Sequence, residues 1–224
     1  MSTMDKSVLR LVQCLDALFP VGGYTLSNGM ETYVQCGTVK DELSLSKHLK
    51  AYLYNISLNE LAFSAMAAKG ENIKYLDELC SAVRTPRELR EGSIRQCQRF
   101  IKLQIGLCGS AALKRYGELI GAGTCDGHYC IAMGLFIREL GVELNTALQL
   151  YAYNIISCMA NHAVKLVPLR QLDGQRALQK TAEEIPEAAK RAISCGYDDL
   201  GASGAGFDIS SMRHEKLYSR LYIS

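Results

Sequence analysis

Two cysteines and a histidine lie close together in the middle of this chain, where their side chains could bind a transition metal. Cys125, His128 and Cys130 fall within six residues, with Asp126 between them. Thiolate and imidazole ligands suit Zn²⁺ or Ni²⁺. A closed structural site needs a fourth ligand, and no second cluster of such residues supplies one. Asp126-Gly127 can equally form a turn before a helix, so we predict no complete metal site and keep the three residues as candidate ligands.

The motifs of nucleotide-binding proteins and of common hydrolases are absent from the sequence. A phosphate-binding loop needs Gly-x-x-x-x-Gly-Lys-Ser/Thr after a strand, whereas the glycine-rich segment 201–206 follows no predicted strand. Neither Gly-x-Ser-x-Gly nor His-Glu-x-x-His occurs. His214 and Glu215 are adjacent, so on a helix their side chains point about 100° apart and cannot form a simple catalytic pair. The sequence therefore predicts neither an enzyme nor a bound cofactor.

The last segment, residues 207–224, mixes aromatic, aliphatic and arginine side chains. Tyr and Arg supply contact area and forked hydrogen bonding at little entropic cost, which is typical of protein interfaces. A final helix packed on the protein's own core would also explain this composition. We predict a partner-binding tail in which the binding residues are Arg213, His214, Glu215, Tyr218 and Arg220.

The pattern of apolar residues favours helices along the whole chain. Leu and Ala far outnumber Val, and Gly and Pro fall between the periodic segments. Thr85 and Glu88 match a capping box, with Pro86 as the first helical residue. The predicted helices cover residues 5–18, 28–36, 41–69, 72–84, 86–107, 110–120, 128–140, 145–167 and 173–195, with a break at Pro186, and a tail helix follows the loop at 196–206. We therefore predict an all-α, single-domain bundle of about ten helices over residues 1–224.

Composition excludes several other classes of protein. The chain has 224 residues, of which 48% are hydrophobic and 21% charged, which is ordinary for a soluble domain with a buried core. The net charge is +2 and no run of Lys or Arg stands out, so we expect no nucleic-acid binding. No stretch of about 18 apolar residues indicates a membrane span. Nine irregularly spaced cysteines predict reduced thiols in a cytosolic protein.

Several segments, in a particular order and spacing, resemble the UreF family. The N-terminal segment has Pro-Val-Gly-Gly-Tyr24 followed by Ser27-Asn-Gly-Met-Glu31, and the tail motif runs from Asp208 to Tyr222. The segments between them are Arg87-Glu-Leu-Arg-Glu-Gly-Ser93, His128 with Ala132 and Gly134, and Lys165-Leu-Val-Pro-Leu-Arg-Gln171 with Gly174-Gln-Arg176. Helix chemistry alone would also explain some of these residues, with Glu31 capping Asn28 and Glu91 pairing with Arg87 and Arg95.

The resemblance implies a cytoplasmic, dimeric accessory protein of urease maturation that is all-helical. Such proteins bind UreD, also called UreH, and then the GTPase UreG, and the assembly delivers nickel to apo-urease and modulates GTP hydrolysis by UreG. The resemblance further implies partner-binding roles for Tyr24, Ser27, Glu31, Lys165, Arg170, Gln171 and Gln175. Two alternatives stay open. One is a helical scaffold unrelated to nickel, and the other is a thiol-dependent metal carrier or enzyme built on Cys125, His128 and Cys130.

Overall fold

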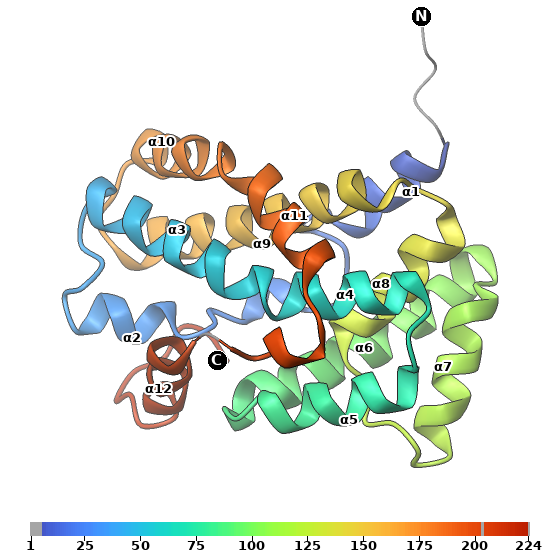
Figure 1. The fold of residues 1–224 in the computed structure, drawn as a ribbon. Helices are drawn as coiled ribbons and strands as arrows, with labels where there is room; N and C mark the ends of the chain where they lie inside the picture. The colour runs from blue at the N-terminus through green and yellow to red at the C-terminus, as the bar shows by residue number, and fades with distance from the viewer. Residues whose placement is uncertain (1–5, 203, 224) are drawn as a thin grey trace, which may run out of the picture.

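The computed structural model describes residues 6–202 and 204–223, and within them the chain is a single-domain bundle of α-helices without a strand. The prediction of an all-α fold is therefore confirmed. Two short 3₁₀ turns lie between α-helices, η1 at Gly23–Thr25 and η2 at Tyr197–Asp199 (Figure 1). The α-helices are α1 Lys6–Cys14, α2 Met30–Gln35, α3 Glu42–Ser57, α4 Glu60–Lys69, α5 Ile73–Val83, α6 Arg87–Cys108, α7 Ala111–Gly121, α8 Tyr129–Leu140, α9 Leu144–Leu166, α10 Gln171–Ala182, α11 Ile185–Ser194 and α12 Ala205–His214.

Helix α9 lies at the centre of the bundle, where α3, α10, α11, α4 and α2 pack around it. Its inward residues recur at helical spacing and are all buried: Leu148, Tyr151, Ile156, Met159 and Ala163. Burial of such apolar side chains is the main stabilising contribution to the fold. None of the described helices combines the length and the apolar composition that crossing a lipid bilayer requires.

Helices α4 and α8 approach each other closely because a glycine lies between them. A Cβ atom at Gly134 would lie 2.2 Å from the backbone oxygen of Ser64 on the neighbouring helix. The hydroxyl of Ser64 donates a hydrogen bond to the Cys130 carbonyl at 2.6 Å, which joins the same two helices. This contact fixes α8, and with it the loop that precedes His128.

The structure corrects the expectation of one long helix over residues 41–69. The chain leaves helical geometry at Asn59, where φ is −124° and ψ is −99°, so α3 and α4 are separate helices. The Asn59 side-chain amide donates to the Asn55 carbonyl at 2.9 Å. Such local side-chain bonds compete with the helical hydrogen bonds of the backbone, which explains why the helix stops here.

The expected capping box at Thr85 and Glu88 is also wrong. Pro86 occupies the N-cap position of α6 and makes no side-chain cap. The Thr85 hydroxyl instead donates to Asp208 at 3.0 Å, and Glu88 binds residues of the C-terminal segment. The break predicted at Pro186 lies a few residues earlier, between Ala182 and Ile185, because proline is well accommodated in the first turn of α11.

Candidate functional site

The C-terminal segment folds back onto the N-terminal motif. We call residues 205–223, which comprise α12 and the irregular segment after it, the C-terminal clasp. Helix α12 lies beside α2 (Figure 1), and past its end the chain turns back, so that the Ile223 amide donates to the Thr25 carbonyl at 2.9 Å. The Gln35 side chain donates to the Ser219 carbonyl at 3.1 Å. The predicted tail helix therefore ends at His214, and the remaining residues bind the first part of the chain.

A glycine permits the close approach of α2 and α12. Gly29 caps α2 with a left-handed φ of 79°, which favours glycine, and a Cβ atom there would lie 2.9 Å from the Ser211 hydroxyl oxygen. The Ser210 hydroxyl donates to the Gly29 carbonyl at 3.1 Å, and Thr32 donates to the Ser210 carbonyl at 2.9 Å. The turn before α2 is thus shaped to receive the clasp.

Glu31 is the acceptor at the centre of this contact, although only 3% of its surface is exposed. Its carboxylate accepts the Leu221 amide at 2.6 Å and the Tyr222 amide at 3.2 Å. The same carboxylate lies 2.9 Å from Nε2 of His214, which is fully buried. A buried carboxylate needs partners of this kind, because an unpaired buried charge is strongly unfavourable.

Glu88, at the start of α6, completes a charged network with the clasp. One of its oxygens lies 2.8 Å from Nδ1 of His214, and the other accepts Arg220 at 2.8 Å. The imidazole of His214 thus has a carboxylate oxygen beside each ring nitrogen, and Arg220 places a cation beside Glu88. Arg87 pairs with Glu215 at 3.2 Å, at a more exposed position. The network ties three distant segments of the sequence together.

Aromatic contacts hold the two ends of the clasp against the bundle. The ring of Phe207 packs on Tyr33, His48 and Tyr52, with ring centroids 5.4 to 5.8 Å apart. Burial lowers the pKa of His48 to about 4, so this ring is uncharged at neutral pH. At the other end, the Tyr222 ring lies 4.5 Å from that of His162 on α9.

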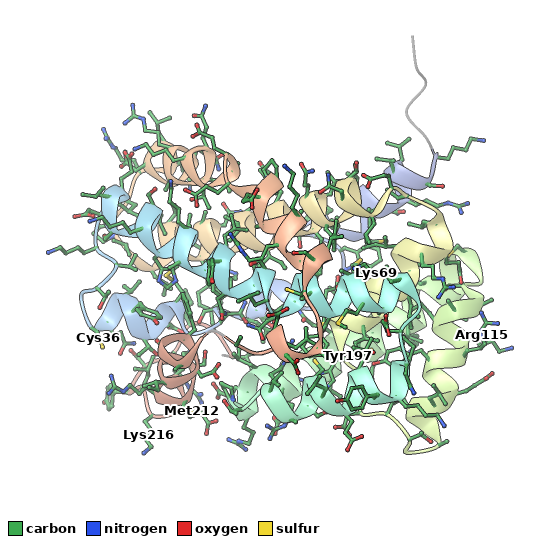
Figure 2. All side chains as sticks on the ribbon, in the orientation of Figure 1. Cys36, Lys69, Arg115, Tyr197, Met212 and Lys216 are labelled. Carbon is green, nitrogen blue, oxygen red and sulfur yellow. The ribbon has the colours of Figure 1, made fainter. Side chains whose placement is uncertain are left out.

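The outer surface of the clasp is apolar and basic. Figure 2 labels Met212 and Lys216, which lie at the edge of the molecule. Tyr218 is fully exposed. The exposed side chains of the clasp include Ile209, Met212, Arg213, Lys216, Tyr218, Arg220, Leu221 and Ile223. Large apolar groups beside arginine are typical of a surface that binds another protein.

Comparison with known proteins identifies the family. The UreF family profile matches residues 39–182. The urease accessory protein UreF of Arthrobacter sp. (strain FB24) is 34% identical over 100% of both chains. This chain belongs to the UreF family. The urease accessory protein UreF of Actinobacillus pleuropneumoniae serotype 5b (strain L20) is 33% identical over 96% of this chain and 97% of that protein. That of Lachnoclostridium phytofermentans is 33% identical over 99% of this chain and 100% of its own.

The residues predicted to bind partners in this UreF-family chain fall into two groups, one buried and one exposed. Ser27, Glu31 and His214 are buried, so their surfaces are not accessible to another protein. Arg213, Tyr218 and Arg220 are exposed, and Glu215 is half-buried beside Arg87. Tyr24 belongs to η1, and its side chain lies outside the described part of the structure.

The predicted residues of the other motif lie on α9 and α10. Lys165 is exposed on the last turn of α9, one turn beyond His162 and its contact with Tyr222. Arg170 precedes α10 and forms an ion pair at 3.0 Å with Asp173, in the first turn of that helix. Gln171 and Gln175 are exposed on the same helix. Lys165 is therefore the member of this group closest in sequence to a residue that contacts the clasp.

Sequence reasoning missed the role of Glu88, and the alternative interpretation of Glu31 as a cap for Asn28 is wrong. Helix α2 is capped by the backbone at Gly29, so Glu31 does not cap Asn28. Glu91 pairs with Arg95 at 3.3 Å as expected, whereas the described partner of Arg87 is Glu215. The only local sign of these contacts was the adjacent opposite charges of Arg87 and Glu88 at the start of α6. Such charges usually face solvent, so they did not predict an ion pair with the distant clasp.

The three candidate metal ligands of this UreF-family chain do not converge. His128 Nε2 lies 2.8 Å from the Ser81 hydroxyl, and Nδ1 lies 3.3 Å from that of Ser93. Cys130 lies against Cys80, with 3.8 Å between the two sulfurs. Among the described residues, the group whose ligand atoms lie within 4.8 Å of one another is Asp77, Asp126 and His128. Cys125 and Cys130 do not belong to it.

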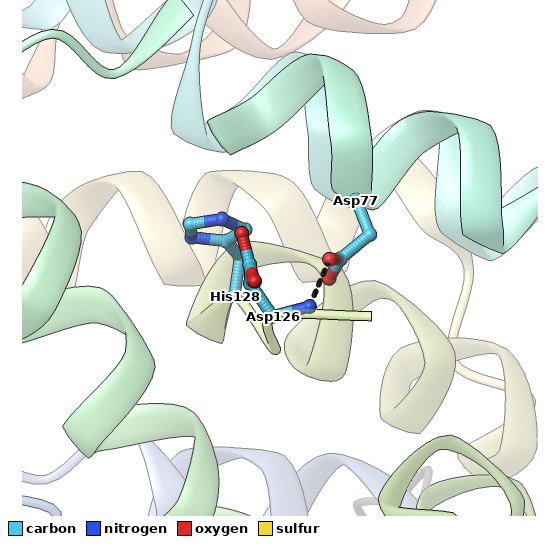
Figure 3. A group of neighbouring side chains, drawn as sticks. All are labelled: Asp77, Asp126 and His128. Carbon is cyan, nitrogen blue, oxygen red and sulfur yellow. Dashed lines mark hydrogen bonds between the residues drawn. The ribbon is translucent and has the colours of Figure 1, made fainter. Parts of the chain in front are cut away.

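Hydrogen bonding already accounts for the group of Asp77, Asp126 and His128. Figure 3 shows Asp77 accepting the Asp126 amide, at 2.6 Å. The same carboxylate accepts the Gly127 amide at 3.1 Å and the Tyr116 hydroxyl at 2.5 Å. Burial lowers the pKa of His128 to about 4. Asp77 therefore holds a turn at Asp126-Gly127, as the alternative interpretation of this segment expected, with φ of 93° at Gly127.

Proposed function

We propose that this chain is a non-catalytic adaptor of urease maturation in the cytoplasm. In this proposal it binds a UreD-type accessory protein and a UreG-type GTPase, and the assembly delivers nickel to apo-urease. Membership of the UreF family supports the role in urease maturation. The C-terminal clasp carries the structural part of the proposal, because it joins the N-terminal motif, the start of α6 and the tail motif in one place.

The two sides of the clasp would have different roles in partner binding. The buried side, with Glu31, Glu88 and His214, sets the position of the segment. The exposed side presents Tyr218, Met212 and other large side chains, which we propose to contact the UreD-type partner. Tyr and Arg are enriched among residues that dominate interface energies, so a few of these side chains should account for most of the binding free energy.

We propose that the UreG-type GTPase binds near Lys165. This side chain is exposed at the end of α9, close in sequence to the ring contact between His162 and Tyr222. An exposed cation can set register and association rate for a partner of opposite charge. Glu31 is buried, so in this proposal it acts by holding the clasp in place. Nickel would pass through the assembly as cargo.

We also propose that the chain forms a homodimer. Exposed apolar side chains on α9 and α10, such as Tyr153 and Leu172, are candidates for the surface that a second copy covers. Sedimentation at micromolar concentration should show a dimer. A strict monomer at high concentration would exclude this part of the proposal.

The direct test is a pull-down with purified UreD-type and UreG-type partners, with and without GTP, combined with a urease activation assay. Tyr218→Ala should weaken the UreD-type complex, and Lys165→Ala should weaken recruitment of the GTPase while the UreD-type complex persists. Deletion of residues 208–224 should abolish both. Full urease activation by the chain without residues 208–224 would refute the adaptor role.

A further inference from the structure

Two buried cysteines from different helices face each other in the interior. Cys80 on α5 and Cys130 on α8 are both almost fully buried, and their sulfurs are 3.8 Å apart. A disulfide requires about 2.05 Å, so the sulfurs need to approach by about 1.8 Å. The two residues are 50 positions apart in the sequence.

A cation lies next to both sulfurs. Nη2 of Arg84 is 3.9 Å from the Cys80 sulfur and 3.8 Å from the Cys130 sulfur. The same guanidinium pairs with Glu60 at 3.0 Å, which fixes its position. A neighbouring positive charge stabilises a thiolate, which is the reactive form of cysteine.

One of the two cysteines lies beside a cavity. Cys130 and Arg84 line an internal cavity of about 160 Å³, whose walls also include polar side chains such as Asn59. That volume accommodates several water molecules. The lining includes Asp16 and Ala17, which are exposed, so the cavity communicates with the surface.

We propose that Cys80 and Cys130 are a redox modification site that forms a reversible disulfide with a peroxide as oxidant. The Cys130 sulfur attacks one peroxide oxygen and the O–O bond breaks; the leaving hydroxide takes the proton of the Cys130 thiol, so a sulfenic acid and water form. The Cys80 sulfur then attacks the sulfenic sulfur, the S–S bond forms and the S–O bond breaks; the leaving hydroxide takes the proton of the Cys80 thiol and becomes a second water. Two thiols and one hydrogen peroxide thus give one disulfide and two waters, with two electrons passing from sulfur to oxygen.

The surroundings of the pair also slow its oxidation, so we expect the disulfide to form only under prolonged exposure to the oxidant. The hydrogen bond with Cys80 and burial raise the pKa of Cys130 well above its ordinary value. The thiolate is therefore a small fraction at neutral pH, and the reaction should be slower than that of an exposed thiol such as Cys36. The disulfide would link α5 to α8 beside the cavity. This inference does not depend on the proposed function.

Peptide mapping of the folded full-length chain after hydrogen peroxide treatment tests the proposal. The background should carry Cys36→Ser and Cys108→Ser, which remove the two exposed thiols. We expect a cross-linked pair of peptides that contain Cys80 and Cys130 and are lighter by two hydrogen atoms than the reduced pair. A thiol reductant should restore the separate peptides. Because the cross-link closes a long loop, the oxidised chain should also unfold at a higher urea concentration than the reduced chain.

Matched variants identify the pair. Cys80→Ser should abolish the cross-link and leave Cys130 as a sulfenic acid that a dimedone-class reagent traps, and Cys125→Ser should leave the cross-link intact. If either variant does not fold, the parent chain still decides the question, because the mapping needs no variant. Recovery of Cys80 and Cys130 as free thiols in folded chains exposed to excess peroxide would overturn the proposal. Conversion of Cys130 to a sulfonic acid without a cross-link would also overturn it.

Discussion

Glu31 and His214 are 183 residues apart in the sequence, yet a carboxylate oxygen of one lies 2.9 Å from Nε2 of the other. Both side chains are buried, and Glu88 occupies the opposite side of the imidazole ring. The position of α2, the start of α6 and the C-terminal clasp are therefore coupled through one ring. A substitution that moves any one of these three segments should therefore also shift the other two.

Removal of the shared ring should destabilise the whole chain. We predict that His214→Ala lowers the free energy of unfolding by about 3–5 kcal/mol, because it removes the side-chain partner of the buried Glu31 carboxylate and one of the two partners of Glu88. Urea denaturation measures this change. The matched control is Arg95→Ala, which breaks the exposed pair with Glu91 and should cost at most about 1 kcal/mol. Equal effects of the two substitutions would contradict the coupling.

Two tyrosines of the clasp should separate binding from stability. Tyr218 is fully exposed, so Tyr218→Ala should leave the melting temperature unchanged and weaken the UreD-type complex by about 2 kcal/mol if this residue dominates the interface. Tyr222 is buried against His162, so Tyr222→Ala should cost about 3 kcal/mol of folding stability. Thermal denaturation and titration calorimetry give the two quantities. The prediction fails if Tyr218→Ala melts early while binding persists.

Two helical glycines should respond in opposite directions to alanine. Gly134→Ala places a methyl group 2.2 Å from the Ser64 carbonyl oxygen, so α4 and α8 must separate and the chain should lose stability. Gly106 lies within α6 with open space around it, and Gly106→Ala should raise the free energy of unfolding by about 0.5–1 kcal/mol. Urea denaturation of both variants checks the sign of each change. Stabilisation by Gly134→Ala would show that the contact between α4 and α8 is looser than described.

Acid should destabilise the chain through two buried histidines. Burial lowers the pKa of His48 and of His128 to about 4, from an ordinary value of 6.5. The unfolded chain therefore takes up protons first, so the free energy of unfolding should fall as the pH drops from 6.5 to about 4. Each histidine should contribute up to about 3 kcal/mol over this range.

A variant that keeps the ring shape of His48 tests this pH dependence. His48→Phe retains an aromatic ring beside Tyr33, Tyr52 and Phe207 but cannot be protonated. Its stability should fall less steeply between pH 6.5 and pH 4 than that of the parent chain. Parallel curves for the two chains, measured by denaturation at each pH, would show that His48 does not titrate differently in the folded and unfolded states.

Local signals explain which parts of the fold were predictable. Gly70, Gly109 and Gly141 end helices with left-handed backbone conformations, and such glycines are visible in the sequence. The break at Asn59 was missed because asparagine interrupts a helix only when its side chain binds nearby backbone, as it does with Asn55.

The candidate site depended on contacts that no local pattern encodes. The tail was recognised as unusual from its residue types, but its composition did not indicate that Glu31 would accept the Leu221 and Tyr222 amides. Glu88 was interpreted as a helix cap because its neighbours in the sequence suggested one. The candidate metal ligands were chosen because they are close in sequence, but their side chains have different neighbours. Cys130 lies against Cys80, and His128 lies against Ser81.

The position of the clasp also has a consequence for how the chain is made. A ribosome synthesises α2 and the start of α6 long before it reaches His214, and early segments begin to fold while later ones are still being added. Glu31 and Glu88 must therefore stay hydrated, or bind something else, until residues 214–222 emerge. Only a chain translated as far as Tyr222 can surround the Glu31 carboxylate as observed. The N-terminal motif thus acquires its folded surroundings only after residues 214–222 have been synthesised.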